Sequence, residues 1–125
     1  MDKKQILKYN KYDKYNKYYY QKSDMRIKEN ISDSDKSISL EKILKIPIKT
    51  YNYINDPYKV KHNGIIAQDL ASIIPNAVHV CELEEFEDLH TIEHTELISY
   101  LIQSIQKLNE KIEVLEEKIE ELTNL

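Results

Sequence analysis

Several residue types are scarce in this 125-residue chain, and each shortage excludes a class of protein. Cys81 is the single cysteine, so a scaffold held together by disulfides within one chain is excluded. Gly64 is the single glycine, which is too few for a glycine-rich loop around a nucleotide phosphate. No run approaches the roughly 20 apolar residues that span a bilayer, and the N-terminus lacks the apolar segment of a secretion signal. We therefore expect no membrane attachment.

What the chain does contain is charge, gathered by sign at its two ends. Residues 1–22 carry seven lysines against two aspartates, and lysine-tyrosine pairs recur there every three residues. A period of three fits neither a helix nor a strand, so we expect a disordered basic arm over residues 1–22. Such an arm could follow phosphates and stack on single-stranded bases. A solvated tail is the more usual fate of such a tract, so nucleic acid is not an expected partner.

The C-terminal region carries the clearest pattern, an apolar residue at alternating spacings of three and four. This heptad repeat has isoleucine at every a position and leucine at every d position. We call its members the heptad seam: Ile98, Leu101, Ile105, Leu108, Ile112, Leu115, Ile119 and Leu122. One helix cannot bury such a stripe alone, so residues 96–125 are expected to form a self-associating coiled coil. Packing against the chain's own domain is the alternative, and the heptads by themselves favour two strands.

Residues 23–95 are expected to fold as a small α+β globule between the arm and the long helix. Residues 38–46 fit a short amphipathic helix ended by Pro47, and residues 48–54 alternate as a strand does. Residues 65–74 are expected to be a helix that Pro75 ends. Short strands are expected at residues 77–80 and 89–92, on either side of an acidic connection.

Two patterns suggest metal sites and are set aside. His90, Glu93 and His94 fit the H-x-x-E-H pattern of inverted zinc peptidases. That segment has the pattern of a strand leading into a helix, however, and no recognisable third ligand follows it. Residues 33–35 begin like a calcium loop, but Ile38 stands where the loop needs glycine. We expect no metal and no other cofactor.

Ser23 and Lys28 are the residue pair with the most chemical potential, because a serine and a lysine can act as a nucleophile and its base. Five positions correspond to about 140° around a helix and to opposite faces of a strand, so their meeting needs an irregular bend or a neighbouring chain. A free lysine has a pKa of about 10.4, so Lys28 would have to be desolvated or influenced by the charge of Arg26. The alternative is that Ser23 and Asp24 cap a short helix and that the basic residues are solvated.

Four blocks of sequence, in order, resemble the endosialidase-type intramolecular chaperone domain, the auto-processing C-terminal module of phage tailspikes and fibres. The blocks are Ser23-Asp24-Met25-Arg26-Ile27-Lys28 with Asn30-Ile31, residues 40–53, Gly64-Ile65-Ile66-Ala67-Gln68-Asp69-Leu70 with Pro75-Asn76-Ala77-Val78, and residues 96–108. The resemblance covers approximately residues 23–115 and leaves the basic arm outside.

The resemblance implies a homotrimeric chaperone, joined through its C-terminal helices, that assembles an N-terminal client or fibre protein and then cuts itself off. Carried onto this sequence, Ser23 is the nucleophile, Lys28 is its base and Lys22-Ser23 is the scissile bond of a single-turnover serine peptidase. The motif-supporting residues are Asp24, Arg26 and Asn30. A location in the virion or the infected host's cytoplasm is implied. The alternatives are a cleavage-dead trimerisation module that presents the basic arm to a partner, and a dimeric adaptor.

Overall fold

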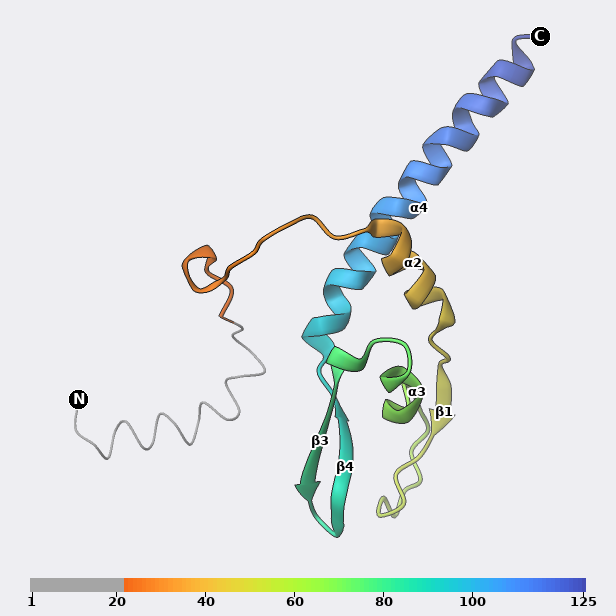
Figure 1. Cartoon of the computed structure of the whole chain (residues 1–125). Coiled ribbons are helices and arrows are strands. Elements are labelled where there is room, and N and C mark those ends of the chain that lie inside the picture. The colour runs from red at the N-terminus through yellow and green to blue at the C-terminus, as the bar shows by residue number, and fades with distance from the viewer. Residues whose placement is uncertain (1–21) are drawn as a thin grey trace. The chain divides into compact units, whose positions relative to one another are not determined.

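The computed structural model describes residues 22–125, which form two compact units divided after Asp33 (Figure 1). Residues 22–33 contain one 3-10 turn, η1 (Met25–Ile27). The second unit combines helices, two small antiparallel sheets and a long C-terminal helix. The predicted mixture of helix and strand is therefore confirmed. The expected basic arm lies outside the described residues, apart from Lys22.

Helix α2 (Lys36–Lys45) begins two residues before the apolar pattern does, because Asp35 caps it. The Asp35 carboxylate accepts a hydrogen bond from the backbone N–H of Ser37 over 2.8 Å, which satisfies a donor that the first turn would leave free. The helix ends at Lys45, one residue before the Ile46-Pro47 pair, as the preference of a pre-proline residue for extended geometry predicts.

The first sheet pairs β1 (Lys49–Tyr51) with β2 (His62–Gly64), so that Tyr51 lies opposite His62. The strand predicted over residues 48–54 is shorter than expected, and β2 was not predicted because His-Asn-Gly carries no alternation of apolar residues. Gly64 leaves room for the side chain of Tyr51: a Cβ atom at this position would lie 3.1 Å from the ring, which would have to shift by a few tenths of an ångström.

The helix predicted over residues 65–74 is wrong in its extent. Helix α3 (Ala67–Ala71) ends early, and Pro75 opens a separate 3-10 turn, η2 (Pro75–Ala77). Proline suits the first position of such a turn because its missing N–H would have no partner there. The Ser72 hydroxyl donates to the carbonyl of Asp69 over 3.0 Å, a local bond that competes with helical continuation.

The second sheet is a hairpin of β3 (Val78–Leu83) and β4 (Phe86–Ile92), which are longer than the two strands predicted. The expected acidic connection mostly lies within these strands, and only Glu84 and Glu85 form the turn. Acidic side chains are tolerated because the residues of the hairpin's distal half are exposed to solvent. Glu84 adopts a φ of 58° in this turn.

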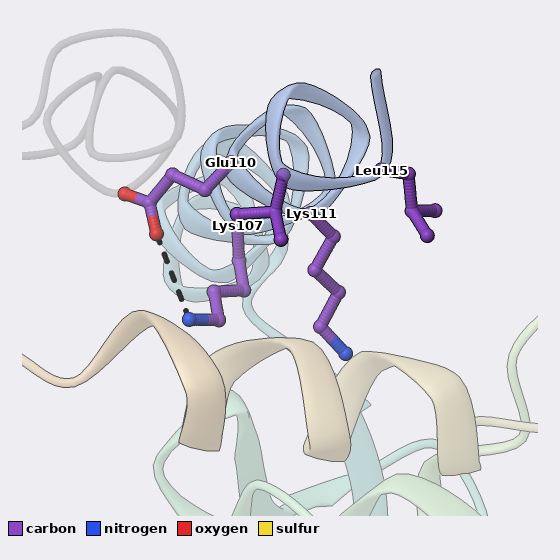
Figure 2. A pocket seen from close by; sticks show the side chains of 5 residues that line it. Lys107, Glu110, Lys111 and Leu115 are labelled. Atoms are coloured by element: carbon purple, nitrogen blue, oxygen red, sulfur yellow. Dashed lines mark ion pairs between the residues drawn. The ribbon is translucent and has the colours of Figure 1, made fainter. Parts of the chain in front are cut away.

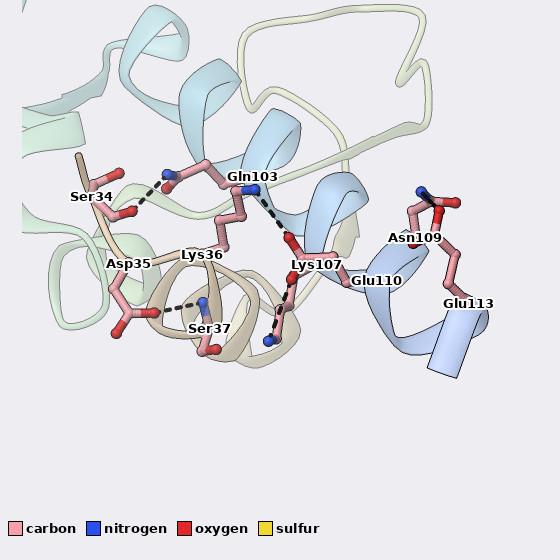
Figure 3. Close-up of polar contacts among 9 residues, drawn as sticks. All are labelled: Ser34, Asp35, Lys36, Ser37, Gln103, Lys107, Asn109, Glu110 and Glu113. Atoms are coloured by element: carbon pink, nitrogen blue, oxygen red, sulfur yellow. Dashed lines mark hydrogen bonds and ion pairs between the residues drawn. The ribbon is translucent and has the colours of Figure 1, made fainter. Parts of the chain in front are cut away.

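Helix α4 (His94–Thr123) runs along α2 and then continues beyond it (Figure 1). Polar contacts join the two helices (Figure 3). The buried Ser39 hydroxyl donates to Oε1 of Gln103 over 2.5 Å, and Nε2 of Gln103 donates to the carbonyl of Ser34 over 3.2 Å. Lys36 pairs with Glu110 over 3.0 Å, and this hydrogen bond, followed by the lysine's charge, lowers the pKa of Glu110.

The hydrophobic core of the described chain is small. Its buried cluster comprises Leu70, Ile74, Ala77 and Leu97, which bring α3, η2 and the first turn of α4 together. Leu40 is also buried on α2. A core of this size supplies little of the free energy that a domain needs, which is a reason to expect further burial between chains.

The heptad seam is exposed along its whole length, with side-chain exposures between 45% and 69%. Helix α2 packs against a different side of α4, where Gln103 contacts α2 and Ser104 is buried. The alternative in which the seam packs against the chain's own domain is therefore wrong for residues 34–125, the unit that contains α4. Within that unit nothing covers the apolar stripe.

Candidate active site

The turn η1 brings Ser23 and Lys28 together within one chain. The Nζ atom of Lys28 lies 2.5 Å from Oγ of Ser23, although the two residues are five positions apart. The bend comes from backbone bonds of a 3-10 turn, from Ile27 N–H to the Asp24 carbonyl and from Lys28 N–H to the Met25 carbonyl, each 3.2 Å long. An irregular bend, one of the two routes considered from the sequence, thus places the pair in contact.

This contact suits proton transfer in either direction. A protonated lysine donates to the serine hydroxyl, and a neutral lysine accepts the hydroxyl proton across the same short distance. The Lys22-Ser23 peptide bond is covalently adjacent to the hydroxyl, so attack on the Lys22 carbonyl requires no movement of a separate substrate. What the arrangement can do chemically is a single acyl transfer on its own chain.

Asp24 makes the cap that shapes this bend. Its Oδ1 accepts from the backbone N–H of Arg26 over 2.8 Å and from Nε of Arg26 over 3.1 Å. Its Oδ2 accepts from Nη2 of Arg26 over 3.0 Å. The side-chain hydrogen bond from Arg26, followed by that from its backbone N–H, lowers the pKa of Asp24. The capping alternative and the Ser23–Lys28 contact are therefore compatible, because the cap forms the turn that brings the pair together.

The role expected of Arg26 is different from the one its geometry supports. From the sequence, its charge was expected to act on Lys28, but its guanidinium is paired with the carboxylate of Asp24. No pattern of apolar periodicity marks such a pair, since it lies in a three-residue turn without buried side chains. The sequence signal that could reveal the Asp24–Arg26 pair is an N-cap residue followed two positions later by arginine.

Ser23 and Lys28 are both exposed in the single chain. The requirement for desolvation of Lys28 is therefore not met by residues 22–33 themselves. Asn30 adopts a φ of 53°, a left-handed conformation that asparagine tolerates better than most residues. It lies two residues after Lys28, and its supporting role in the motif stays a prediction.

The zinc pattern is divided between two elements. His90 lies in β4 and His94 begins α4, so the two do not share a face of one helix. The Oε2 atom of Glu93 lies 2.6 Å from the Nε2 atom of His79. Among residues 22–125 no group of three or more His, Cys, Asp or Glu side chains is placed to hold a metal ion. Asp35, which belongs to the pattern that begins like a calcium loop, serves as the N-cap of α2.

Two of the hollows formed by described residues adjoin α4, and neither is lined by Ser23 or Lys28. One, of about 370 Å³, is lined by Lys107, Glu110, Lys111, Val114 and Leu115 (Figure 2). Its polar rim is an ion pair of 3.6 Å between Lys107 and Glu110. The other, of about 380 Å³, lies between α2 and α4 around Ser39, Tyr100 and Gln103.

None of the helices described for residues 22–125 combines the length and the apolar composition that a membrane-spanning helix needs.

Comparison with known proteins finds a family whose sequence pattern matches part of this chain. The sequence pattern of the family described as chaperone of endosialidase matches residues 23–79, which begin at Ser23 and include Lys28. A solved structure described as a novel intramolecular chaperon covers 71% of this chain with 17% identity and a TM-score of 0.49.

Relatives include a probable tail fiber protein of Escherichia phage Phieco32, 32% identical over 79% of this chain. The long tail fiber protein Gp37 of Enterobacteria phage M1 is 35% identical over 77% of the chain. A myelin gene regulatory factor-like protein of Dictyostelium discoideum is 29% identical over 80%. The chain spans 14%, 39% and 12% of these three proteins, respectively. The match to the chaperone of endosialidase family over residues 23–79 confirms the resemblance that the sequence motifs predict.

Proposed function

We propose that this chain is an intramolecular chaperone that associates as a homotrimer and cuts itself once between Lys22 and Ser23. The observation that carries the proposal is the 2.5 Å contact between Nζ of Lys28 and Oγ of Ser23, directly beside that peptide bond. The family match begins at the same serine. A serine and a lysine in contact are a recognised arrangement for nucleophilic catalysis on an acyl group.

The proposed reaction proceeds in two steps. A neutral Lys28 amine takes the proton of the Ser23 hydroxyl, and Oγ attacks the carbonyl carbon of Lys22. The bond from that carbon to the Ser23 nitrogen breaks, and the nitrogen leaves as an amine with a proton from the Lys28 ammonium. Water then hydrolyses the ester. The products are a carboxylate at Lys22 and a free amino group at Ser23, and the lysine is regenerated.

Association of chains supplies the condition that one chain lacks. Ser23 and Lys28 are exposed in the single chain, whereas a lysine acts as a base near neutral pH only when its charged form is disfavoured by desolvation. A neighbouring chain that covers the turn would provide this desolvation. Cleavage would then follow assembly, which is the order that a self-removing chaperone requires.

The exposed heptad seam is the surface that supports association. Eight large apolar side chains are at least 45% exposed along one stripe of α4. Burying them between copies would gain about 25 cal/mol for each Å² of apolar surface removed from water. We take the number of three chains from the family resemblance, because a seam of isoleucine and leucine alone favours two strands.

The proposed client lies on the N-terminal side of Ser23. Two of the relatives are described as tail fibre proteins of phages, so we propose a fibre protein as the client and the virion or the infected host's cytoplasm as the location. The competing function is a trimerisation module that does not cleave and presents the basic arm to a partner. The exposure of the dyad in a single chain is the observation that favours this alternative.

Intact-mass spectrometry of the assembled chain tests the proposal. The full chain should lose residues 1–22, whereas the Ser23→Ala and Lys28→Ala variants should remain uncut at the same oligomeric state. Ser32→Ala, in the same unit but outside the dyad, is the matched control and should be cut as the parent is. A parent chain that trimerises and stays uncut would leave the trimerisation module as the correct reading, and a dimer in the ultracentrifuge would indicate the adaptor.

A further inference from the structure

We propose that Asp24 is a positioning residue for the Ser23–Lys28 dyad, acting through the cap that it makes on η1. This assignment rests on the proposed self-cleavage and adds a residue to its machinery. Asp24 does not touch the reacting atoms in the structure. Its carboxylate instead holds the turn whose formation places the lysine amine against the serine hydroxyl.

The turn has to be held, because the extended chain separates the two residues. Five residues in an extended strand span about 17 Å between Cα atoms. The turn replaces this separation with a side-chain contact of 2.5 Å. Lys28 is fixed at the end of the turn by its own N–H, which donates to the Met25 carbonyl. A chain that leaves the turn therefore loses the dyad geometry.

Burial does not hold this turn within the described chain. None of its residues is buried, and the side chains of Met25 and Ile27 are 75% and 63% exposed. A single turn of 3-10 helix without a packed face is marginal, since few hydrogen bonds offset the conformational entropy lost. Local polar contacts carry its stability, and the carboxylate of Asp24 accepts three of them, all from Arg26.

The three contacts divide into a cap and a brace. The cap is the bond from the backbone N–H of Arg26, which any residue at position 26 other than proline can donate. The brace is the pair of bonds from the guanidinium of Arg26, a residue whose side chain is 86% exposed to solvent. An exposed ion pair contributes little, whereas an N-cap is worth considerably more. The cap is therefore the principal contribution, and Arg26 orients the carboxylate that makes it.

The assignment is tested by the rate of loss of residues 1–22 from the full chain, followed by mass spectrometry. Asp24→Ala should slow cleavage roughly five- to tenfold, the loss expected when an N-cap is removed from a marginal turn. Asp24→Asn should restore a rate within about threefold of the parent, because asparagine caps as well as aspartate does. Arg26→Ala should cost only about two- to threefold. Asp33→Ala, in the same unit, is the matched control and should leave the rate unchanged.

Thermal melting and ultracentrifugation of the same variants separate positioning from folding. Residues 22–33 form a unit apart from the helices and sheets, so all four variants should melt and associate as the parent does. Asp24→Ala cleaving at the parental rate, or Asp24→Asn as slow as Asp24→Ala, would overturn the assignment while leaving self-cleavage in place. An uncut parent chain would reject the proposed function, and the assignment with it.

Discussion

The amine of Lys28 lies 2.5 Å from the hydroxyl of Ser23, because the three-residue turn η1 between them folds the chain back. Neither side chain is buried in the single chain. Contact geometry and solvent exclusion are thus separate requirements of the proposed cleavage. The turn meets the first within one chain, and we propose that association through α4 meets the second.

An ester intermediate is the distinctive chemical prediction. If Ser23 attacks the Lys22 carbonyl, the bond between the two residues becomes an ester before water cleaves it. Added hydroxylamine should therefore accelerate release of the N-terminal fragment and leave a hydroxamate on Lys22, detectable by mass spectrometry. The Ser23→Ala chain is the control and should gain no hydroxamate. A parent fragment that ends only in a carboxylate, at a rate independent of hydroxylamine, would argue for direct attack by water.

The heptad seam predicts which face of α4 carries association. Ile112→Asp should convert the assembled chain to monomers, because it would place a charge in a buried apolar seam. Val114→Asp is the matched control, since its side chain is 48% exposed and that of Ile112 is 51% exposed, but it lies outside the seam. Sedimentation velocity distinguishes them. Equal dissociation by both variants would show that the seam is not the interface.

The sequence predicts the helices of this fold better than its turns. Apolar periodicity predicts both ends of α2 and α4 to within two residues, and α2 ends where Pro47 predicts. The cap that Asp35 makes on α2 is a feature that the periodicity does not predict. The strand β2 carries none of these signals, because its position depends on pairing with β1 and on the space that Gly64 leaves for Tyr51. The helix expected to reach Pro75 stops at Ala71, where a serine hydroxyl competes for a backbone carbonyl.

The candidate site, too, is predicted only in part by the sequence. Its residues are recognisable as a motif, and the need for a bend follows from their spacing. The pairing of Arg26 with Asp24 is not predictable from periodicity, since a three-residue turn has no repeat. The contact of Gln103 with Ser39, two residues 64 positions apart in sequence, is likewise set by the approach of α2 and α4.

Gln103 is predicted to be a structural anchor between α2 and α4. Gln103→Ala would leave the hydroxyl of Ser39, a residue with 3% exposure, without its acceptor. The free energy of unfolding should fall by about 1–3 kcal/mol, measured by chemical denaturation at a fixed chain concentration. Asn109→Ala removes an exposed bond to Glu113 (Figure 3) and should change it by less than about 0.5 kcal/mol. Equal effects of the two variants would contradict this role.

The Lys36–Glu110 pair predicts a loss of stability in acid. Its hydrogen bond lowers the pKa of Glu110 in the folded chain, so the pair stabilises the fold fully above the ordinary glutamate pKa of about 4.3. This contribution is lost as the pH falls through the lowered value, because the folded chain then has to take up a proton. The difference in unfolding free energy between the parent and Glu110→Gln should therefore shrink below about pH 4. A difference that stays constant with pH would exclude the linkage.

The central claim is that cleavage at Lys22-Ser23 depends on association through the heptad seam. The most direct measurement is the N-terminal sequence of the products formed by the parent, Ile112→Asp and Val114→Asp chains at equal concentration. The parent and Val114→Asp should yield a new N-terminus that reads Ser-Asp-Met, while monomeric Ile112→Asp keeps residues 1–22 attached. Monomeric Ile112→Asp that cuts itself at the parental rate would contradict the claim.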